Sequence, residues 1–377
     1  MSGPLHGVSV VELAGLGPAP FCGMVLADLG AEVIRVDRQG DNTMSFLPGP
    51  EHDVHSRGKR SIAIDLKSEV GVEVVLRLVR RSDILIEGYR PGVTERLGLG
   101  PGRCLAENPA LVYGRMTGWG QEGPYATTAG HDIDYIAVSG VLHAIGTQEA
   151  PIVPLNLLGD FGGGGMLLVV GVLAALFAAR SGGVGQVVDA AMVDGSAVLA
   201  SSIHGMLDAG LWDDRRESNF LDGGAPFYAV YATSDGRHMA VGALEPQFFA
   251  SLVDHLGVDV PPQLDREGWP EMRATFGRAF ATRTQQEWSE AFAGSDACVF
   301  PVRSLTEARL DPHLQSRETF IDVGGVTQPA PAPRFSATPT GPPKPPVERG
   351  SDTDDVLEAL GYSEGEIIKL RGDGVVG

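Results

Sequence analysis

Short apolar runs alternate with amphipathic stretches along the first half of the chain. Apolar runs rich in β-branched residues and bounded by turn residues are typical of buried strands. Helical patterns lie between them at 21–29 and 69–80. Strands that alternate with helices predict βαβ units and a mostly parallel sheet, which binds ligands beyond the carboxyl ends of its strands. The strand-like runs are 8–13, 32–37, 61–66, 83–87 and 111–116.

The pattern changes after Arg180. One more strand is predicted at 186–192 and a helix at 193–207. Two alternating apolar runs then flank the turn Ser234-Asp235-Gly236-Arg237, and an Asp-Gly turn between such runs is a strong hairpin signal. The two runs are 227–231 and 238–243, and further helices are predicted at 246–256, 284–293, 351–360 and 363–370, the last with the capping-box pair Ser363 and Glu366.

These patterns predict an α/β protein with a large, Rossmann-like parallel-sheet domain and a smaller α+β domain. A chain of 377 residues agrees with two domains, since about 150 residues per domain is usual. We divide it into a large domain at 1–200 that 315–377 completes, a linker helix region at 201–226, a small domain at 227–305, and a return linker with C-terminal helices at 306–377.

Composition narrows the choice of partners. The net charge of −19 disfavours nucleic acid and anionic membrane surfaces, and an anionic ligand would need a local basic pocket. Cys22, Cys104 and Cys298 form no close pair, which argues against a disulfide framework and a cysteine-rich metal site. We therefore expect no bound metal.

One segment raises the question of a membrane. Residues 162–179 carry no charge and are nearly long enough to span a bilayer. Its five glycines and the polar sequence on both sides favour a helix buried in a soluble protein. Residues 1–6 lack a basic region followed by an apolar core, so we expect a cytoplasmic protein without a membrane partner.

Two motifs carry the candidate chemistry. The first is Gly130-His131-Asp132-Ile133-Asp134-Tyr135, and the second is Gly159-Asp160-Phe161 followed by glycines at 162–165. Imidazole exchanges a proton near neutral pH, and a carboxylate before a glycine run that opens a helix lies near backbone N–H donors. Such a pair can move a proton beside an oxyanion. The plainer alternatives are a structural histidine and a helix N-cap.

A nicotinamide-dependent oxidoreductase is the weaker alternative. The turn at 14–20 resembles a dinucleotide loop, with Asp37 at the distance expected for a ribose contact. The third glycine of that fingerprint is missing, and Pro18 and Pro20 remove two backbone donors that a pyrophosphate would need.

Taken together, several segments resemble the family III coenzyme A transferases, the CaiB/BaiF superfamily. Within it, 130–135 and 154–164 resemble the α-methylacyl-CoA racemase branch. The resemblance covers almost the whole chain and implies an interlocked homodimer that acts in branched-chain fatty acid metabolism. The segments are 10–14, 28–37, 87–92, 114–120 and 189–195.

The resemblance also assigns roles to residues. His131 and Asp160 take the two acid/base positions, and Glu245 matches a small-domain glutamate that pairs with the histidine of the other subunit. The stretch 39–58 matches the family least well, so its role in closing over the ligand stays open. The coenzyme A contacts carry over to Arg38, Ile64, Asp65, Leu66, Lys67, Gly88, Tyr89, Arg90, Arg96, Gly130, Asp132, Ile133, Asp134 and Tyr135.

The expected reaction is racemisation or epimerisation of 2-methylacyl-CoA thioesters through an enolate, with no cofactor beyond the coenzyme A moiety of the substrate. Removal of an α-proton needs fixed donors for the enolate oxygen, and we expect the backbone N–H of Asp160 and the start of the glycine helix to supply them. Two different bases then allow the proton to leave one face and return on the other. The main alternative is an acyl-CoA:carboxylate CoA-transferase with Asp160 as nucleophile.

Overall fold

The computed structural model describes residues 2–40 and 47–377. Its internal contacts divide the chain into two compact units. Unit 1 contains Met1–Ser139, Leu155–Leu199 and Ser316–Gly377, and unit 2 contains Gly140–Pro154 and Ala200–Gln315.

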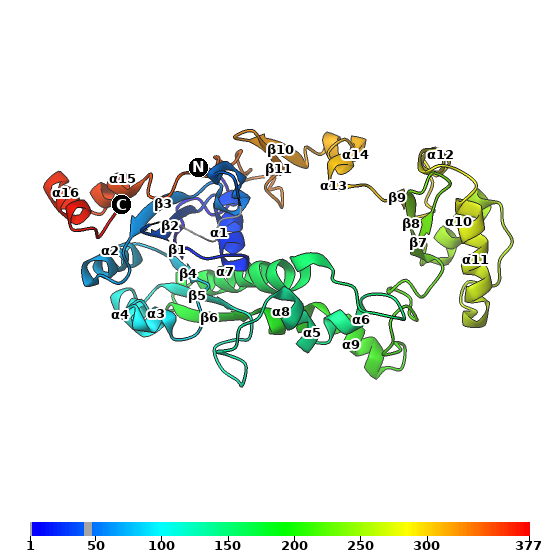
Figure 1. The fold of residues 1–377 in the computed structure, drawn as a ribbon, viewed down its shortest axis with the longest axis horizontal. Coiled ribbons are helices and arrows are strands. Elements are labelled where there is room, and N and C mark those ends of the chain that lie inside the picture. Colours follow the sequence, from blue (N-terminus) through cyan, green and yellow to red (C-terminus); the bar gives the residue numbers. More distant parts are fainter. Residues whose placement is uncertain (1, 41–46) are drawn as a thin grey trace. The chain divides into compact units, whose positions relative to one another are not determined.

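Unit 1 is built on a six-stranded parallel sheet with the order β3-β2-β1-β4-β5-β6 (Figure 1). This is the strand order of dinucleotide-binding folds, and the direction of winding reverses between β1 and β4. The predicted parallel α/β sheet is therefore confirmed, with each strand close to its expected place. The strands are β1 Ser9–Leu13, β2 Glu32–Arg38, β3 Arg60–Ile64, β4 Ile84–Glu87, β5 Val112–Thr117 and β6 Gln186–Ala191.

Helices cover both faces of this sheet because successive strand residues point to opposite sides. Val11 belongs to one buried cluster with α2 (Glu69–Val79), α4 (Pro101–Glu107), α15 (Thr353–Ala359) and α16 (Glu364–Gly372). Its neighbour Val10 belongs to the other, with α1 (Pro18–Asp28) and α7 (Leu167–Arg180).

Most helix predictions hold, and two need correction. The capping box of α16 is present, since Ser363 N–H donates to Glu366 Oε2 at 2.8 Å. Helix α1 begins earlier than expected, at Pro18, because proline is well suited to the first turn of a helix. The single helix expected at 193–207 is wrong: α8 (Met192–Leu199) and α9 (Ser201–Asp208) are separate helices that meet at Ala200.

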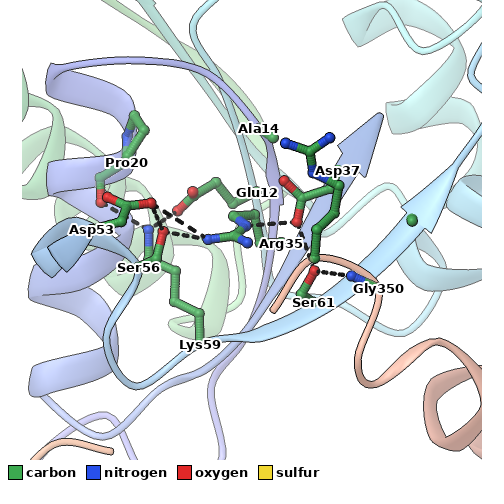
Figure 2. A network of polar contacts seen from close by, with 12 residues as sticks. Glu12, Ala14, Pro20, Arg35, Asp37, Asp53, Ser56, Lys59, Ser61 and Gly350 are labelled. Atoms are coloured by element: carbon green, nitrogen blue, oxygen red, sulfur yellow. Dashed lines mark hydrogen bonds and ion pairs between the residues drawn. The ribbon is translucent and has the colours of Figure 1, made fainter. Parts of the chain in front are cut away.

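A buried polar network joins the returning C-terminal segment to the sheet (Figure 2). Asp37 Oδ2 accepts from Ser61 Oγ at 2.6 Å, and Ser61 Oγ accepts the backbone N–H of Gly350 at 2.8 Å. Beside it, Lys59 Nζ lies 2.6 Å from Glu12 Oε2 and donates to Pro20 O at 2.9 Å. The network therefore connects β1, β2, β3 and α1 with residues close to the C-terminus.

Unit 2 contains a three-stranded antiparallel sheet of β7 (Tyr228–Ala232), β8 (His238–Gly242) and β9 (Val299–Pro301). The expected hairpin is confirmed, since Thr233 N–H donates to Arg237 O across the Asp-Gly turn. Helix α10 (Pro246–Leu256) has the predicted bounds, and α12 (Gln285–Ala291) lies within its expected range. The sequence analysis missed α11 (Trp269–Phe280), whose buried residues Trp269, Met272, Phe276 and Phe280 follow a helical spacing.

Shorter elements complete the described part of the chain. They are α3 Val93–Arg96, α5 Asp132–Val138, α6 Val141–Ala144, α13 Leu305–Ala308, α14 Pro312–Ser316, the hairpin β10 Phe320–Val323 with β11 Val326–Pro329, the 3₁₀ turns Pro50–His52, Val54–Ser56, Leu155–Leu157 and Arg266–Gly268, and the π-helix Leu158–Met166.

One continuous helical stretch, Leu155–Arg180, is long and apolar enough to count as a candidate membrane span, and 44% of its apolar window is buried within the protein. A core helix passes the same test, and the α7 part of this stretch packs against β5 and β6.

Candidate active site

A pocket of about 180 Å³ opens at the carboxyl ends of β1, β4 and β5, where ligands of this sheet type are expected. This is also where the winding of the sheet reverses. The lining includes predicted coenzyme A contacts from two loops, Gly88-Tyr89-Arg90 and Gly130, together with Tyr135 on α5. Trp119 forms part of the wall and packs edge-on against Tyr135, with ring centroids 4.8 Å apart.

Four cations lie at the same edge of the sheet. Arg38 ends β2, Lys67 follows β3, Arg90 follows β4 and Arg96 belongs to α3, and all four are exposed. The Arg38 guanidinium carbon lies 5.5 Å from the centroid of the Tyr89 ring. On a chain with net charge −19, this is the local basic region that an anionic ligand would need.

The other predicted coenzyme A contacts of this region are less exposed. Ile64 and Leu66 are buried at the end of β3, and Asp65 Oδ1 accepts the backbone N–H of Lys67 at 3.0 Å. Their contacts with coenzyme A remain a prediction.

A buried ion pair, which the sequence analysis missed, anchors the loop that carries Tyr89 and Arg90. Arg115 Nε on β5 lies 2.9 Å from Glu87 Oε1, and Glu87 Oε2 accepts the backbone N–H of Tyr89 at 2.7 Å. Charged residues in the middle and at the end of adjacent apolar strands were the available signal.

His131 is the N-cap of α5, so the 130–135 motif is not a simple loop, as expected, but the start of a helix. Its backbone N–H donates to Asp134 Oδ2 at 2.9 Å, and its side chain is exposed. Tyr135 O–H donates to Gly130 O, and a side chain at Gly118 would collide with the Tyr135 ring. These contacts hold the His131 backbone against the pocket wall. Ile133, like His131, is exposed.

Asp160 lies within the π-helix Leu158–Met166 and does not precede a helix as an N-cap. A π-helix is rare and is often found at functional sites. The glycines after Asp160 allow very close packing: a Cβ at Gly163 would lie 2.6 Å from Ser196 N, and one at Gly195 would lie 1.8 Å from Gly163 O. The glycine run therefore serves the approach of the π-helix to α8.

The carboxylate of Asp160 is partly buried, and burial raises its pKa above the usual range. A hydrogen bond from Asn156 Nδ2 to Asp160 Oδ2, at 3.0 Å, lowers the pKa, the charge of Asp132 raises it, and the charge of His131 lowers it. The structure therefore brings Asp160 within electrostatic reach of His131. Asn156 was missed as a site residue; its i, i+4 spacing from Asp160 was the signal.

One expectation about this site is wrong. The backbone N–H of Asp160 is not available to an enolate oxygen, because it donates to Asp132 Oδ2 at 2.7 Å. No feature of the sequence pairs these two residues, which are 28 positions apart.

The segment 39–58, whose role stayed open, reaches the site through one described residue. His55 packs against Phe161, next to Asp160, with ring centroids 5.3 Å apart, and burial lowers the pKa of its imidazole. Residues 41–46 of this segment lie outside the described part of the chain.

Glu245 belongs to unit 2, where it is the N-cap of α10. Its charge, after burial, contributes to a raised pKa of Cys298. Its pairing with a histidine stays a prediction. Among the described residues, no group of three or more His, Cys, Asp or Glu side chains is placed to hold a metal ion.

Comparisons with known proteins agree with the sheet and the motifs. The family model of CoA-transferase family III matches residues 5–353. The α-methylacyl-CoA racemase of Mus musculus is 48% identical over 99% of this chain and 97% of its own length, and that of Homo sapiens is 46% identical over the same shares. The crystal structure of a CAIB/BAIF family protein from Brucella suis superimposes with a TM-score of 0.82 at 26% identity, covering 96% of this chain and 100% of its own. The chain belongs to CoA-transferase family III.

Proposed function

We propose that this protein racemises 2-methylacyl-CoA thioesters by moving the α-proton between His131 and Asp160. The observation that carries the proposal is the Asp160 carboxylate, held by Asn156 and lying within electrostatic reach of an exposed imidazole. The identity of 48% and 46% to two proteins named α-methylacyl-CoA racemase supports the same reaction.

The raised pKa of Asp160 suits this chemistry. A general acid/base works best when its pKa lies near the working pH, and a raised carboxyl pKa approaches that of imidazole. In one direction Asp160 removes the proton and imidazolium returns one to the other face. In the reverse direction neutral His131 is the base and protonated Asp160 the acid, so each turnover leaves the two groups ready for the opposite direction.

The enolate oxygen needs fixed donors other than the N–H of Asp160. The first backbone N–H groups of a helix have no intrahelical partner, and α5 begins directly after His131. We assign the enolate oxygen to this end of α5. Loss of one such donor typically costs about 3 kcal/mol of transition-state stabilisation.

The proposal places coenzyme A along the carboxyl edge of the sheet. Its phosphates would meet Arg38, Lys67, Arg90 and Arg96, and its pantetheine arm would follow the pocket beside Tyr89 and Tyr135. The reaction requires no group beyond the coenzyme A moiety of the substrate.

The proposal also includes a homodimer, in which Glu245 of the partner subunit pairs with His131. Exposed apolar side chains support an uncovered interface in each unit. Val170 and Phe177 on α7 are exposed in unit 1, and Val230 and Phe300 are exposed in unit 2. Large exposed apolar patches commonly mark protein interfaces.

Hydrogen exchange at the α-carbon tests the function. Each enantiomer of a 2-methylacyl-CoA is incubated with enzyme in deuterated water, and we expect deuterium at the α-carbon and convergence of both enantiomers on one mixture. Absence of exchange with every branched acyl-CoA tried would overturn the proposal.

The alternative, CoA transfer to a free carboxylate, uses the same Asp160 as nucleophile but has no need of an imidazole. His131→Ala therefore separates the two reactions. It should abolish α-proton exchange in a racemase, whereas transfer of CoA to an added carboxylic acid that survives in this variant would favour the transferase.

A further inference from the structure

A buried carboxylate, Asp132, lies between the two proposed acid/base residues in the chain contacts. It follows His131 directly, begins α5 and is 6% exposed. Its Oδ2 accepts the backbone N–H of Asp160 at 2.7 Å. Its Oδ1 is also buried and has no hydrogen-bond partner in the described part of the chain. A buried carboxylate oxygen without a partner is unfavourable, so this residue needs an explanation beyond packing.

The chain leaves room for this carboxylate at one glycine. A Cβ at Gly159 would lie 2.6 Å from Asp132 Oδ2 and 2.9 Å from its Cγ. Helix α5 and the π-helix thus approach each other closely, and the Asp132 side chain fills the space between them.

We propose that Asp132 is a positioning residue for the proton transfer, because its carboxylate ties the backbone of Asp160 to the start of α5 and thereby fixes Asp160 relative to His131. The inference rests on the proposed function. Both groups must reach the same carbon atom, and a displacement of about 1 Å can reduce the rate about 100-fold. A single short hydrogen bond between the two backbone segments limits that displacement.

The charge of Asp132 has a second effect on the same partner. It adds to burial in raising the pKa of Asp160. A positioning role therefore predicts a change in the pH profile as well as in the rate. By contrast, a side chain that only contacts coenzyme A would change KM and leave kcat and its pH dependence unaltered.

Two substitutions separate the hydrogen bond from the charge. Asp132→Ala removes both, whereas Asp132→Asn keeps a carbonyl oxygen that can accept from Asp160 N–H. Asp355→Asn is the matched control, since Asp355 is an exposed aspartate in the first turn of α15. For each variant, kcat, KM and their pH dependence are measured with both enantiomers of the substrate.

We expect Asp132→Ala to lower kcat about 100-fold with little change in KM. Asp132→Asn should keep kcat within about tenfold of wild type, because the acceptor is retained. With the charge removed, the pKa of Asp160 should fall, so the limb of the pH profile that reports Asp160 should move to lower pH. Asp355→Asn should match wild type in every measurement.

An unchanged kcat in Asp132→Ala, or a raised KM with unchanged kcat, would overturn the inference. If Asp132→Ala fails to fold, the pH profile of Asp132→Asn decides, and an unshifted profile refutes the role.

Loss of the proposed function is distinguished by the wild type. If wild type and Asp355→Asn exchange no α-proton, the function is wrong, and amide hydrogen exchange of Asp160 then tests the positioning role alone. The amide should exchange faster in Asp132→Ala than in wild type, with Asp132→Asn between them; equal rates in all three proteins would refute it.

Discussion

At the scale of single residues, the chemistry depends on how Asp160 is surrounded. Burial raises its pKa, and the hydrogen bond from Asn156 is the largest contribution that lowers it. The imidazole of His131 is exposed, so its proton exchanges with solvent, whereas Asp160 is half-buried. Two groups of different chemistry are thus brought closer in proton affinity by their environments.

We expect Asn156→Ala to shift the pH dependence of the reaction upward. Without the Nδ2 donor, the carboxylate form of Asp160 loses stabilisation and its pKa rises further. The direction that uses Asp160 as base requires its deprotonated form, so the acidic limb of kcat should move to higher pH. Initial rates with each enantiomer across a pH series measure this.

Gln286→Ala, at an exposed position of α12, is the control and should leave the profile in place. A profile that is unchanged in Asn156→Ala as well would show that Asn156 does not act on Asp160 during catalysis.

At the scale of elements, the glycine run shapes the site by allowing close packing. Gly163 faces the start of α8 and Gly165 faces Phe21 on α1, and a Cβ at Gly165 would lie 2.6 Å from that ring. The π-helix carries Asp160 at its third residue, so its seat against α8 and α1 sets where the carboxylate lies.

Gly163→Ala tests this packing. Its Cβ would have to displace the backbone of α8, and overpacking of this kind typically costs about 1–3 kcal/mol. We expect a lower midpoint in urea unfolding together with slower α-proton exchange, since Asp160 moves with the helix.

Gly365→Ala on α16 is the matched control. Nothing lies within 4 Å of a Cβ at Gly365, so the same substitution there should stabilise the protein slightly or leave it unchanged. A midpoint for Gly163→Ala equal to that of Gly365→Ala would contradict the packing argument.

At the scale of the whole molecule, the proposed site residues are divided between the two units. His131 and Asp160 belong to unit 1, and Glu245 belongs to unit 2. Each unit also exposes apolar side chains, such as Phe177 at 75% and Phe300 at 71%. Both observations support a site that is completed by a second copy of the chain.

Complementation between two inactive variants tests the shared site. We expect His131→Ala and Glu245→Ala homodimers each to exchange poorly, and purified mixed dimers to recover about half of wild-type exchange, because a two-fold dimer of this kind keeps one intact pair. Carrying different affinity tags on the two chains allows the mixed dimer to be isolated.

Mixed dimers of two His131→Ala chains are the control and should recover nothing. Verified His131→Ala/Glu245→Ala dimers that also recover nothing would mean that the pair lies within one chain or that Glu245 is misassigned.

The sequence by itself determined the parallel sheet, its strands, the hairpin of unit 2 and the family, because alternation of apolar and polar residues and local turn chemistry depend on neighbours in the chain. It also pointed to His131 and Asp160, whose roles remain predictions. Only the tertiary structure decided that Asp160 sits inside a π-helix, that its N–H is occupied by Asp132, and that Glu87 and Arg115 support the Tyr89 loop. Those facts arise from contacts between segments far apart in the chain, where packing and burial override local preference.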